Sequence, residues 1–190
     1  MATKQKSAAP FTMAGILAGA LLPLVYAIAI LSDSSWTFNV NTLSDLGSSD
    51  VEFTAKLFNC ACIFGGALIA IFGIGKAYIR KNLDALTGLL MVVGGICLAC
   101  IGLATKANDL EMHLLVTTVF FIMVFVAIIL SMASDAMHGR KYAAAVGAIF
   151  LIIMIMVIPG FNYPGVEVIG AVTSCVWLVS QALSLSFSKD

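Results

Sequence analysis

The stretch MHLLVTTVFFIMVFVAIILSMAS, residues 112–134, contains no Asp, Glu, Lys or Arg. A helix rises about 1.5 Å per residue, so roughly 20 residues cross the 30 Å hydrocarbon layer of a bilayer. A buried helix of a soluble protein would more often be shorter and would carry a polar face. Five further stretches also lack these residues, and all six are 19 to 26 residues long: 7–32, 57–75, 85–105, 142–166 and 168–188. The sequence therefore predicts six transmembrane helices.

The composition supports a membrane protein. Of the 190 residues, 61% are apolar and 11% are charged, whereas a soluble domain carries about a quarter charged residues. None of the six stretches alternates polar and apolar residues as a barrel strand does. The formal net charge is zero, so we expect no nucleic-acid partner. We predict an all-α integral membrane bundle that forms a single domain over residues 1–190 and lies in the cell membrane.

The lysines and arginines predict the orientation of the bundle, because cytoplasmic loops carry an excess of these residues. Only Lys56 and Lys106 fall in the connections on one side of the predicted membrane. The other eight fall on the opposite side: Lys4, Lys6, Lys76, Arg80, Lys81, Arg140, Lys141 and Lys189. We therefore expect both termini in the cytoplasm and the long loop at residues 33–49 outside.

Glycine spacing predicts how the helices pack. Lipid tails are as apolar as leucine, so membrane helices associate through close contact at small residues. We interpret the spaced glycines as contacts within the bundle, with dimerisation through the first pair as the alternative. The glycines occur four or seven residues apart in the first three expected helices: Gly15 and Gly19, Gly66 and Gly73, and Gly88, Gly95 and Gly102.

Five polar residues gather at the expected outer ends of the helices. Ser44 and Asp45 lie in the first outer loop. Asn59 lies about two turns inside the second helix, His113 opens the fourth, and Glu167 opens the sixth. Each has a structural explanation, namely a turn cap for Asp45, a hydrogen bond for the amide and the histidine, and the helix dipole for the glutamate. Together they are candidate ligand-binding residues, because two carboxylates and a histidine at one aqueous mouth can bind a headgroup or transfer protons.

Two other acidic residues are explained by helix capping. Ser49 with Glu52, and Asn108 with Glu111, have the spacing of a capping box. We therefore exclude Glu52 and Glu111 from the candidate site.

We expect no cofactor and no metal. The chain has only two histidines, and a zinc site usually draws on several His or Cys ligands. Cys97-x-x-Cys100 matches a redox motif by spacing, so a membrane thiol oxidoreductase is an alternative. We favour a packing role, because cysteine also acts as a small apolar residue and the first outer loop contains no Cys pair.

Three functions fit these observations. The leading hypothesis is that a pocket open to the outer leaflet binds a membrane lipid or other amphiphile. The alternatives are a membrane-embedded enzyme that modifies lipid at the same mouth, and a structural subunit that binds a membrane partner or a second copy of the chain. The enzyme requires His113 within hydrogen-bond reach of Asp45 or Glu167.

The run Ser44-Asp45-Leu46-Gly47, followed by Leu57-Phe58-Asn59, resembles a known family of prokaryotic multi-pass membrane proteins, domain of unknown function 998. The likeness continues at His113 and at Glu167 with Trp177, and covers nearly the whole chain. Members often carry arginine after the glutamate, where this chain has valine. The family is distantly similar to the Frag/DRAM/Sfk membrane proteins, some tied to lipid remodelling or distribution. The resemblance implies the multi-helix fold and an outer face of interest, but no reaction.

Overall fold

The computed structural model describes the backbone of residues 2–187 and the side chains of residues 8–186. Within this part of the chain the structure is entirely helical, as predicted. The elements are α1 (Ala2–Leu31), the short 3-10 helix η1 (Leu43–Ser48), α2 (Glu52–Ile79), α3 (Asn82–Leu103), α4 (Leu110–Met137), α5 (Lys141–Val157) and α6 (Tyr163–Phe187).

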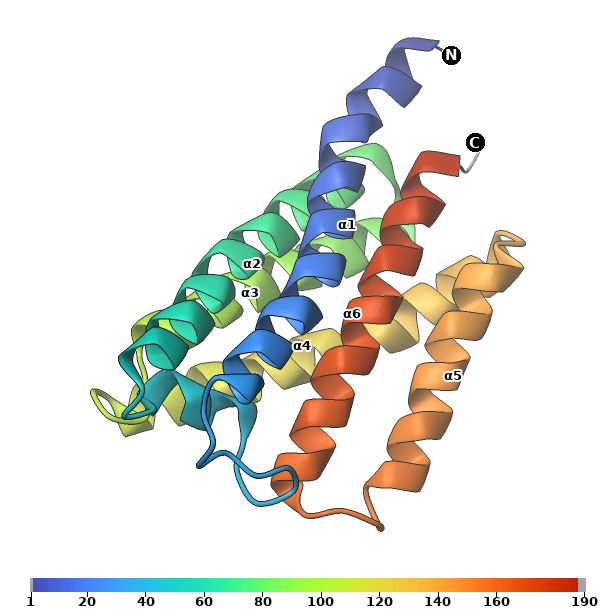
Figure 1. Cartoon of the computed structure of the whole chain (residues 1–190). Helices are drawn as coiled ribbons and strands as arrows, with labels where there is room; N and C mark the ends of the chain where they lie inside the picture. Colours follow the sequence, from blue (N-terminus) through green and yellow to red (C-terminus); the bar gives the residue numbers. More distant parts are fainter. Residues whose placement is uncertain (1, 188–190) are drawn as a thin grey trace.

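The six α-helices run up and down in chain order, and each contacts the next (Figure 1). Helix α6 returns to contact α1, so the helices form a closed ring. Both ends of the chain lie at the same end of the bundle, which we call the terminal end (Figure 1). The opposite end carries η1 and the long α1–α2 connection, and we call it the loop end. Helix α5 lies at the edge, beyond α6 from α1, and contacts only α4 and α6 extensively.

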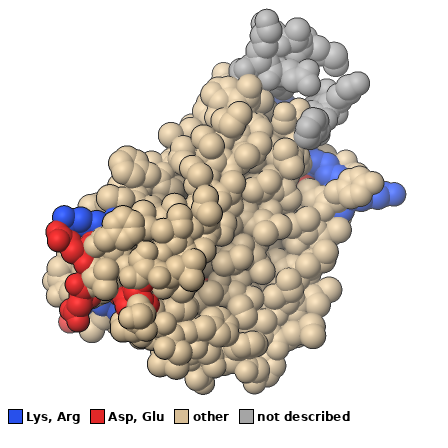
Figure 2. Space-filling view, in the orientation of Figure 1, with Lys and Arg blue, Asp and Glu red and all other residues tan. Residues whose placement is uncertain are grey.

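Five of the helices, α1 to α4 and α6, are long and apolar enough to cross a membrane. Figure 2 shows charged side chains gathered at separated places on the visible face, with uncharged surface between them. These features are consistent with a multi-pass membrane protein. Helix α5 is the exception, because its 17 residues make it shorter than the charge-free stretch that predicted it.

The short α5 and the early start of α6 have one cause. The stretch at residues 142–166 contains Pro159 and Pro164. Proline lacks a backbone N–H and disfavours helical backbone in the residue before it, so a helix tends to end there. Helix α5 ends at Val157, and α6 begins at Tyr163 with Pro164 in its first turn, a position that favours proline. Glu167 therefore lies one turn inside α6 instead of opening it, which corrects the prediction.

Small residues bring α2 and α3 into backbone contact, as their spacing predicts. A Cβ atom on Gly66 would collide with the backbone of Gly95, and one on Gly73 with the backbone of Gly88. Helix α1 packs on α6 in the same way, since a Cβ on Gly19 would lie 2.7 Å from the Cys175 carbonyl oxygen. The packing interpretation is thus confirmed for these seams. The alternative, dimerisation through the α1 glycines, loses its surface because α6 covers it.

The loop end is closed by the chain's own connections. Leu46 of η1 is fully buried and packs with Tyr26 and Phe58. The Asn39 side chain accepts a hydrogen bond of 2.8 Å from the backbone N–H of Asn162, which ties the α1–α2 connection to the α5–α6 connection. Asn39 has a φ of 64°, a left-handed conformation that asparagine tolerates better than most residues. The long loop is therefore held in place by buried apolar and polar contacts.

The two capping boxes are not formed. The Ser49 hydroxyl donates to Asp33 at 2.5 Å, and helix α2 begins at Glu52 after an uncapped Val51. In α4 the cap is Asp109, whose carboxylate accepts from the Met112 N–H at 3.0 Å. Ser49 does not cap α2 because its hydroxyl bonds to Asp33. Asn108 does not cap α4 because the next residue, Asp109, does so.

Candidate functional site

Asp45 anchors η1 at the loop end. Its carboxylate accepts hydrogen bonds from Lys106 at 2.6 Å and from the Thr42 N–H at 2.7 Å. Lys106 also donates to the Thr42 hydroxyl at 2.6 Å, which lies 3.0 Å from the Ser44 hydroxyl. Burial raises the pKa of Asp45, but the hydrogen bonds from Lys106 and Thr42 outweigh it and hold the pKa below its usual value. The explanation of Asp45 as a turn cap is confirmed.

Glu167 lies beneath the same short helix. Its side chain is buried, and its carboxylate lies near the backbone N–H groups of Leu43 and Ser44. The first N–H groups of a helix have no partner within it, so a carboxylate near them is favourably placed. The Tyr163 side chain, one turn earlier in α6, also lies near Glu167. Ser44 and Asp45 therefore belong to one network around η1, and Glu167 lies beside it.

Asn59 and His113 bond to other groups. The Asn59 amide donates to the Gly47 carbonyl at 3.0 Å, and the His113 Nδ1 lies 2.7 Å from the Ala104 carbonyl oxygen, to which it donates. The Asn59 Oδ1 and the His113 Nε2 are buried and make no hydrogen bond to any described residue. The five predicted residues thus share the loop end, but only Ser44 and Asp45 share a hydrogen-bond network, beside which Glu167 lies.

A groove opens between α4, α5 and α6 beside this network. Its volume is about 450 Å³, and all but a few of the side chains that line it are apolar. Glu167 and Tyr163 are its polar residues toward the loop end, and Thr118 of α4 is the third. Of the five predicted residues, Glu167 alone lines the groove. The other lining residues include Phe121, Phe125, Phe150, Met154, Val166 and Gly170.

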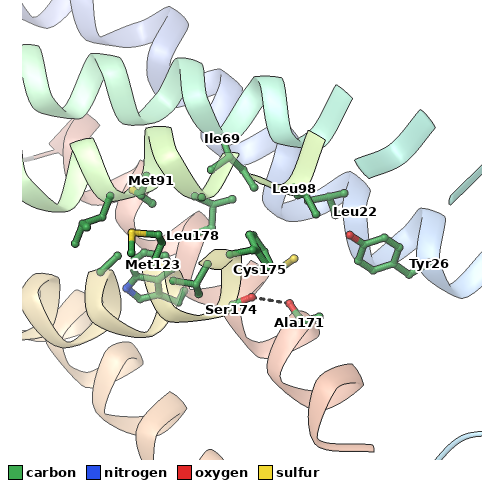
Figure 3. Close-up of a pocket in the computed structure, with 16 residues that line it drawn as sticks. Leu22, Tyr26, Ile69, Met91, Leu98, Met123, Ala171, Ser174, Cys175 and Leu178 are labelled. Carbon is green, nitrogen blue, oxygen red and sulfur yellow. Dashed lines mark hydrogen bonds between the residues drawn. The ribbon is translucent and has the colours of Figure 1, made fainter. Parts of the chain in front are cut away.

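A second cavity lies in the middle of the bundle (Figure 3). It is lined by Tyr26, Cys175 and Ser174, among mainly aliphatic side chains, and its volume is about 50 Å³. The Ser174 hydroxyl is occupied by a 2.8 Å hydrogen bond to the Ala171 carbonyl. Such a space holds one or two water molecules at most. The groove is therefore the ligand-sized space near Glu167, and neither space is lined by Asn59.

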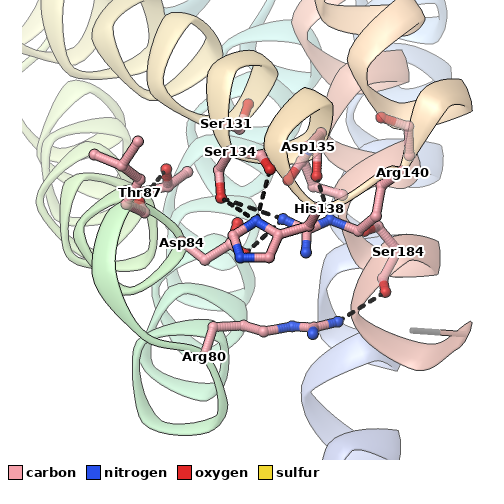
Figure 4. Close-up of polar contacts among 12 residues, drawn as sticks. Arg80, Asp84, Thr87, Ser131, Ser134, Asp135, His138, Arg140 and Ser184 are labelled. Carbon is pink, nitrogen blue, oxygen red and sulfur yellow. Dashed lines mark hydrogen bonds and ion pairs between the residues drawn. The ribbon is translucent and has the colours of Figure 1, made fainter. Parts of the chain in front are cut away.

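At the terminal end, sequence reasoning missed a buried ion cluster, part of which Figure 4 shows. Arg140 bonds to Asp84 at 2.5 Å and to Asp135 at 2.6 Å. Lys76 lies 3.5 Å from Asp84 and donates to Gln181, whose amide donates to Asp135 at 2.7 Å. The cluster therefore joins α2, α3, α4, α6 and the α4–α5 connection.

The position of this cluster corrects the sequence-based description of Lys76, which lies in α2 and not in a loop, whereas Arg80 and Arg140 do lie in the connections. Lys76 is 3% exposed and Arg80 8% exposed. Helices α2 and α4 continue past the charge-free stretches, to Ile79 and Met137, and carry their last charges into the bundle. Ionisable groups buried in membrane helices are costly and commonly functional. The sequence did carry a signal of this cluster: a lysine and two aspartates lie near helix ends on the side of both termini.

Cys97 and Cys100 carry free thiols, as do the other cysteines. In the part of the chain described here, no group of three or more His, Cys, Asp and Glu residues is placed to hold a metal ion.

These features define a class: helical bundles with several apolar helices of membrane-crossing length and polar clusters at both ends. A family model described as "Protein of unknown function (DUF998)" matches residues 16–184, and the chain belongs to that family. The resemblance found at residues 44–47 is thereby confirmed, and the match covers both polar ends. The prokaryotic character of the family and its wider likeness to the Frag/DRAM/Sfk proteins stay predictions. No curated protein and no solved structure matches the chain.

Proposed function

We propose that this protein crosses the cell membrane six times, with both termini in the cytoplasm, and binds a membrane lipid or other amphiphile in the groove between α4, α5 and α6. The headgroup would lie at Glu167 in the outer leaflet. The observation that carries the proposal is a 450 Å³ apolar groove that includes a buried carboxylate at its loop end.

The six-span topology is supported by charge and by geometry. The sequence places eight of the ten Lys and Arg residues near or beyond the helix ends on the side that carries both termini, and the positive-inside rule assigns such a side to the cytoplasm. Helix α5 is about 25 Å long at 1.5 Å per residue. A span a few ångströms short is accommodated by local thinning of the bilayer at modest cost.

The groove has the size and chemistry of an amphiphile site. Ligand pockets commonly measure about 300–1,000 Å³ and combine apolar walls with a few polar groups. The aromatic and aliphatic side chains of α4 and α5 would contact an acyl chain. Glu167 would accept a hydrogen bond from an amine or hydroxyl headgroup, with Tyr163 beside it. Ser44 and Asp45 would hold η1 over the carboxylate, and Asn59 and His113 would support the outer mouth.

The enzyme alternative is not favoured by the observed contacts. It required His113 to bond to Asp45 or Glu167, but these groups bond elsewhere. His113 donates to Ala104, Asp45 accepts from Lys106, and Glu167 lies beside the start of η1.

The test is to fill the groove. Gly170 lines it, and a Cβ atom there would lie 3.4 Å from the flexible end of Met154, so Gly170→Leu can be accommodated while occupying the space. Ala133→Leu introduces the same side chain at an exposed position of α4 outside the groove. Lipid bound to each protein, purified in mild detergent, would be quantified by mass spectrometry.

We expect Gly170→Leu to lose bound lipid and Ala133→Leu to keep it. Glu167→Gln, which retains the volume but not the charge, should change which headgroups are recovered more than how much lipid is recovered. Equal lipid in Gly170→Leu and the unaltered protein would contradict the proposal. Because Glu167 supports η1, the groove-filling variant keeps the test valid if Glu167→Gln proves unstable.

A further inference from the structure

The groove between α4, α5 and α6 contains one acidic side chain and, among the described residues, no basic one. The acidic side chain is Glu167, which is 7% exposed. Only neutral polar groups lie beside its carboxylate, namely the backbone N–H groups of Leu43 and Ser44 and the Tyr163 hydroxyl. A buried charge is costly unless an opposite charge accompanies it. A cationic group that entered the groove would supply that charge.

The two lysines at the loop end are already bound to other carboxylates. Lys106 acts on Glu167 through its charge, but its ammonium bonds to Asp45 at 2.6 Å, and the Asp45 charge acts on Glu167 in the opposite sense. Lys56, the other lysine of this end, bonds to Glu52 at 2.5 Å. Two carboxylates and one ammonium at Asp45, Glu167 and Lys106 therefore leave one net negative charge beside the groove.

The loop end as a whole is acidic. It carries seven carboxylates against Lys56 and Lys106, and Figure 2 shows most of the visible Asp and Glu side chains gathered there. A surface of one sign attracts groups of the opposite sign, so this end favours a cationic headgroup over an anionic one. The seven carboxylates are those of Asp33, Asp45, Asp50, Glu52, Asp109, Glu111 and Glu167.

We propose that the groove selects lipids whose headgroup carries a primary ammonium, which donates hydrogen bonds to the Glu167 carboxylate. This inference rests on the proposed function, because it names the headgroup of the amphiphile in the same groove. Hydrogen bonds between an ammonium and a carboxylate are roughly twice as strong as neutral ones. The ring of Tyr163, one turn earlier in α6, also offers a face that attracts a cation.

Other headgroups fit the groove less well. An anionic headgroup finds no basic residue among the described walls and is repelled by Glu167. A hydroxyl headgroup leaves the buried carboxylate without an opposite charge. A quaternary ammonium brings the charge but has no N–H to donate. A soluble amine leaves empty the apolar walls, which include Phe121 and Phe125. A lipid with a primary ammonium is therefore the occupant.

The experiment uses the full chain, purified in mild detergent, and four lipids with the same acyl chains. Phosphatidylethanolamine has a primary ammonium, its N,N-dimethyl derivative keeps one N–H, phosphatidylcholine has none, and phosphatidylglycerol is anionic. Glycerophosphoethanolamine, which lacks acyl chains, tests a soluble amine. Native mass spectrometry counts bound lipid, and the melting temperature is followed as each compound is added. The variants are Glu167→Gln, Gly170→Leu and, as the matched control, Glu52→Gln at a side chain that is 78% exposed.

We expect phosphatidylethanolamine to bind about tenfold more tightly than phosphatidylglycerol or phosphatidylcholine, the factor that one hydrogen bond between charged groups contributes. The dimethyl derivative should bind with intermediate affinity. Glu167→Gln should remove this preference, Glu52→Gln should keep it, and Gly170→Leu should lose all four lipids. The lipid series needs no substitution, so the inference stays testable if Glu167→Gln does not fold.

Equal binding of all four lipids, lost in Gly170→Leu, would overturn this inference and leave the groove as an unselective lipid site. Lipid binding that Gly170→Leu does not reduce would contradict the proposed function, and this inference with it. Stabilisation by glycerophosphoethanolamine equal to that by phosphatidylethanolamine would overturn the inference in favour of a soluble amine.

Discussion

The two ends of the bundle use the same acid–base chemistry at different depths. At the loop end, Asp45 and Lys106 form a pair whose side chains are 34% and 26% exposed. At the terminal end, Asp84, Asp135 and Arg140 form pairs whose side chains are at most 11% exposed. An exposed pair contributes roughly 0–1 kcal/mol to stability. Removing one partner of a buried pair costs about 3–5 kcal/mol, because the other charge is left buried alone.

The ends also differ in what their charges connect. The Asp45 network holds a six-residue 3-10 helix against the α3–α4 connection, so it shapes a local mouth. The terminal cluster joins four helices through Gln181 and Arg140, so it fixes how the helices meet. The partly exposed Asp45 network therefore shapes one local mouth, whereas the buried terminal cluster fixes the packing of the helices. The types of charged residue are similar at the two ends, and burial is what distinguishes them.

The largest effect should come from breaking the terminal cluster. Asp135→Ala removes one of the two carboxylates of Arg140 and the acceptor of the Gln181 amide. We expect the free energy of unfolding to fall by about 3–5 kcal/mol, because Arg140 loses one of its two buried carboxylates and the buried Gln181 amide loses its acceptor. Thermal unfolding in detergent measures it, with exposed Glu111→Ala as the matched control. If Asp135→Ala lost no more stability than Glu111→Ala, the terminal cluster would not be the more stabilising end of the bundle.

The next effect concerns the apolar part of η1. Leu46 is fully buried in the loop-end core, so Leu46→Ala should cost about 3 kcal/mol through lost burial and the cavity left behind. Leu110→Ala, at a 52% exposed position near the same end, should change little. The two variants would be compared by the same unfolding assay. If Leu46→Ala lowered the free energy of unfolding more than Asp135→Ala, the loop end would contribute more to stability than the terminal cluster, contrary to this account.

A smaller and pH-dependent effect is expected at Asp45. Its pKa is lower in the folded protein than its usual value, so its contribution is present above the unfolded pKa, about 3.9, and is lost as pH falls through the folded value. Lys106→Met removes the main partner and should cost about 1 kcal/mol or less at neutral pH, because the pair is partly exposed. Unfolding measured from pH 7 to pH 3 should show this difference shrinking below about pH 4. A difference that grows as pH falls would contradict the account.

The smallest effect is expected for the fully surface-exposed pair. Lys56 and Glu52 are 72% and 78% exposed at successive turns of α2. Lys56→Ala should change the free energy of unfolding by only a few tenths of a kcal/mol, as exposed i,i+4 pairs do. A cost approaching that of Asp135→Ala would show that burial is not the property that distinguishes the two ends.

The sequence predicts the helices well because uncharged stretches of membrane-crossing length have few other uses. It predicts the α2–α3 seam because glycine spacing specifies which face can approach a neighbour. It also explains Asp45, because a turn cap is a local interaction. It places the start of α6 wrongly because apolar content alone does not register how Pro159 and Pro164 interrupt a helix.

The terminal cluster could not be found by the same reasoning. Counting charges as helix boundaries sends Lys76 and Asp135 to the loops, whereas both lie within helices that continue past them. Gln181, which bonds to both, is 105 residues from Lys76 and 46 residues from Asp135 in the chain. The sequence could not predict the groove either, because the groove depends on the distance of α5 from α4 and α6.

The topology is the claim on which the proposed outer mouth depends, and cysteine labelling in intact cells tests it most directly. In a variant whose five native cysteines are replaced, Val40→Cys places a thiol at a 68% exposed position at the loop end, and Tyr142→Cys at a 93% exposed position near the terminal end. We expect a membrane-impermeant maleimide to label Val40→Cys in intact cells and Tyr142→Cys only after permeabilisation. Labelling of Tyr142→Cys in intact cells, with Val40→Cys protected, would contradict the account.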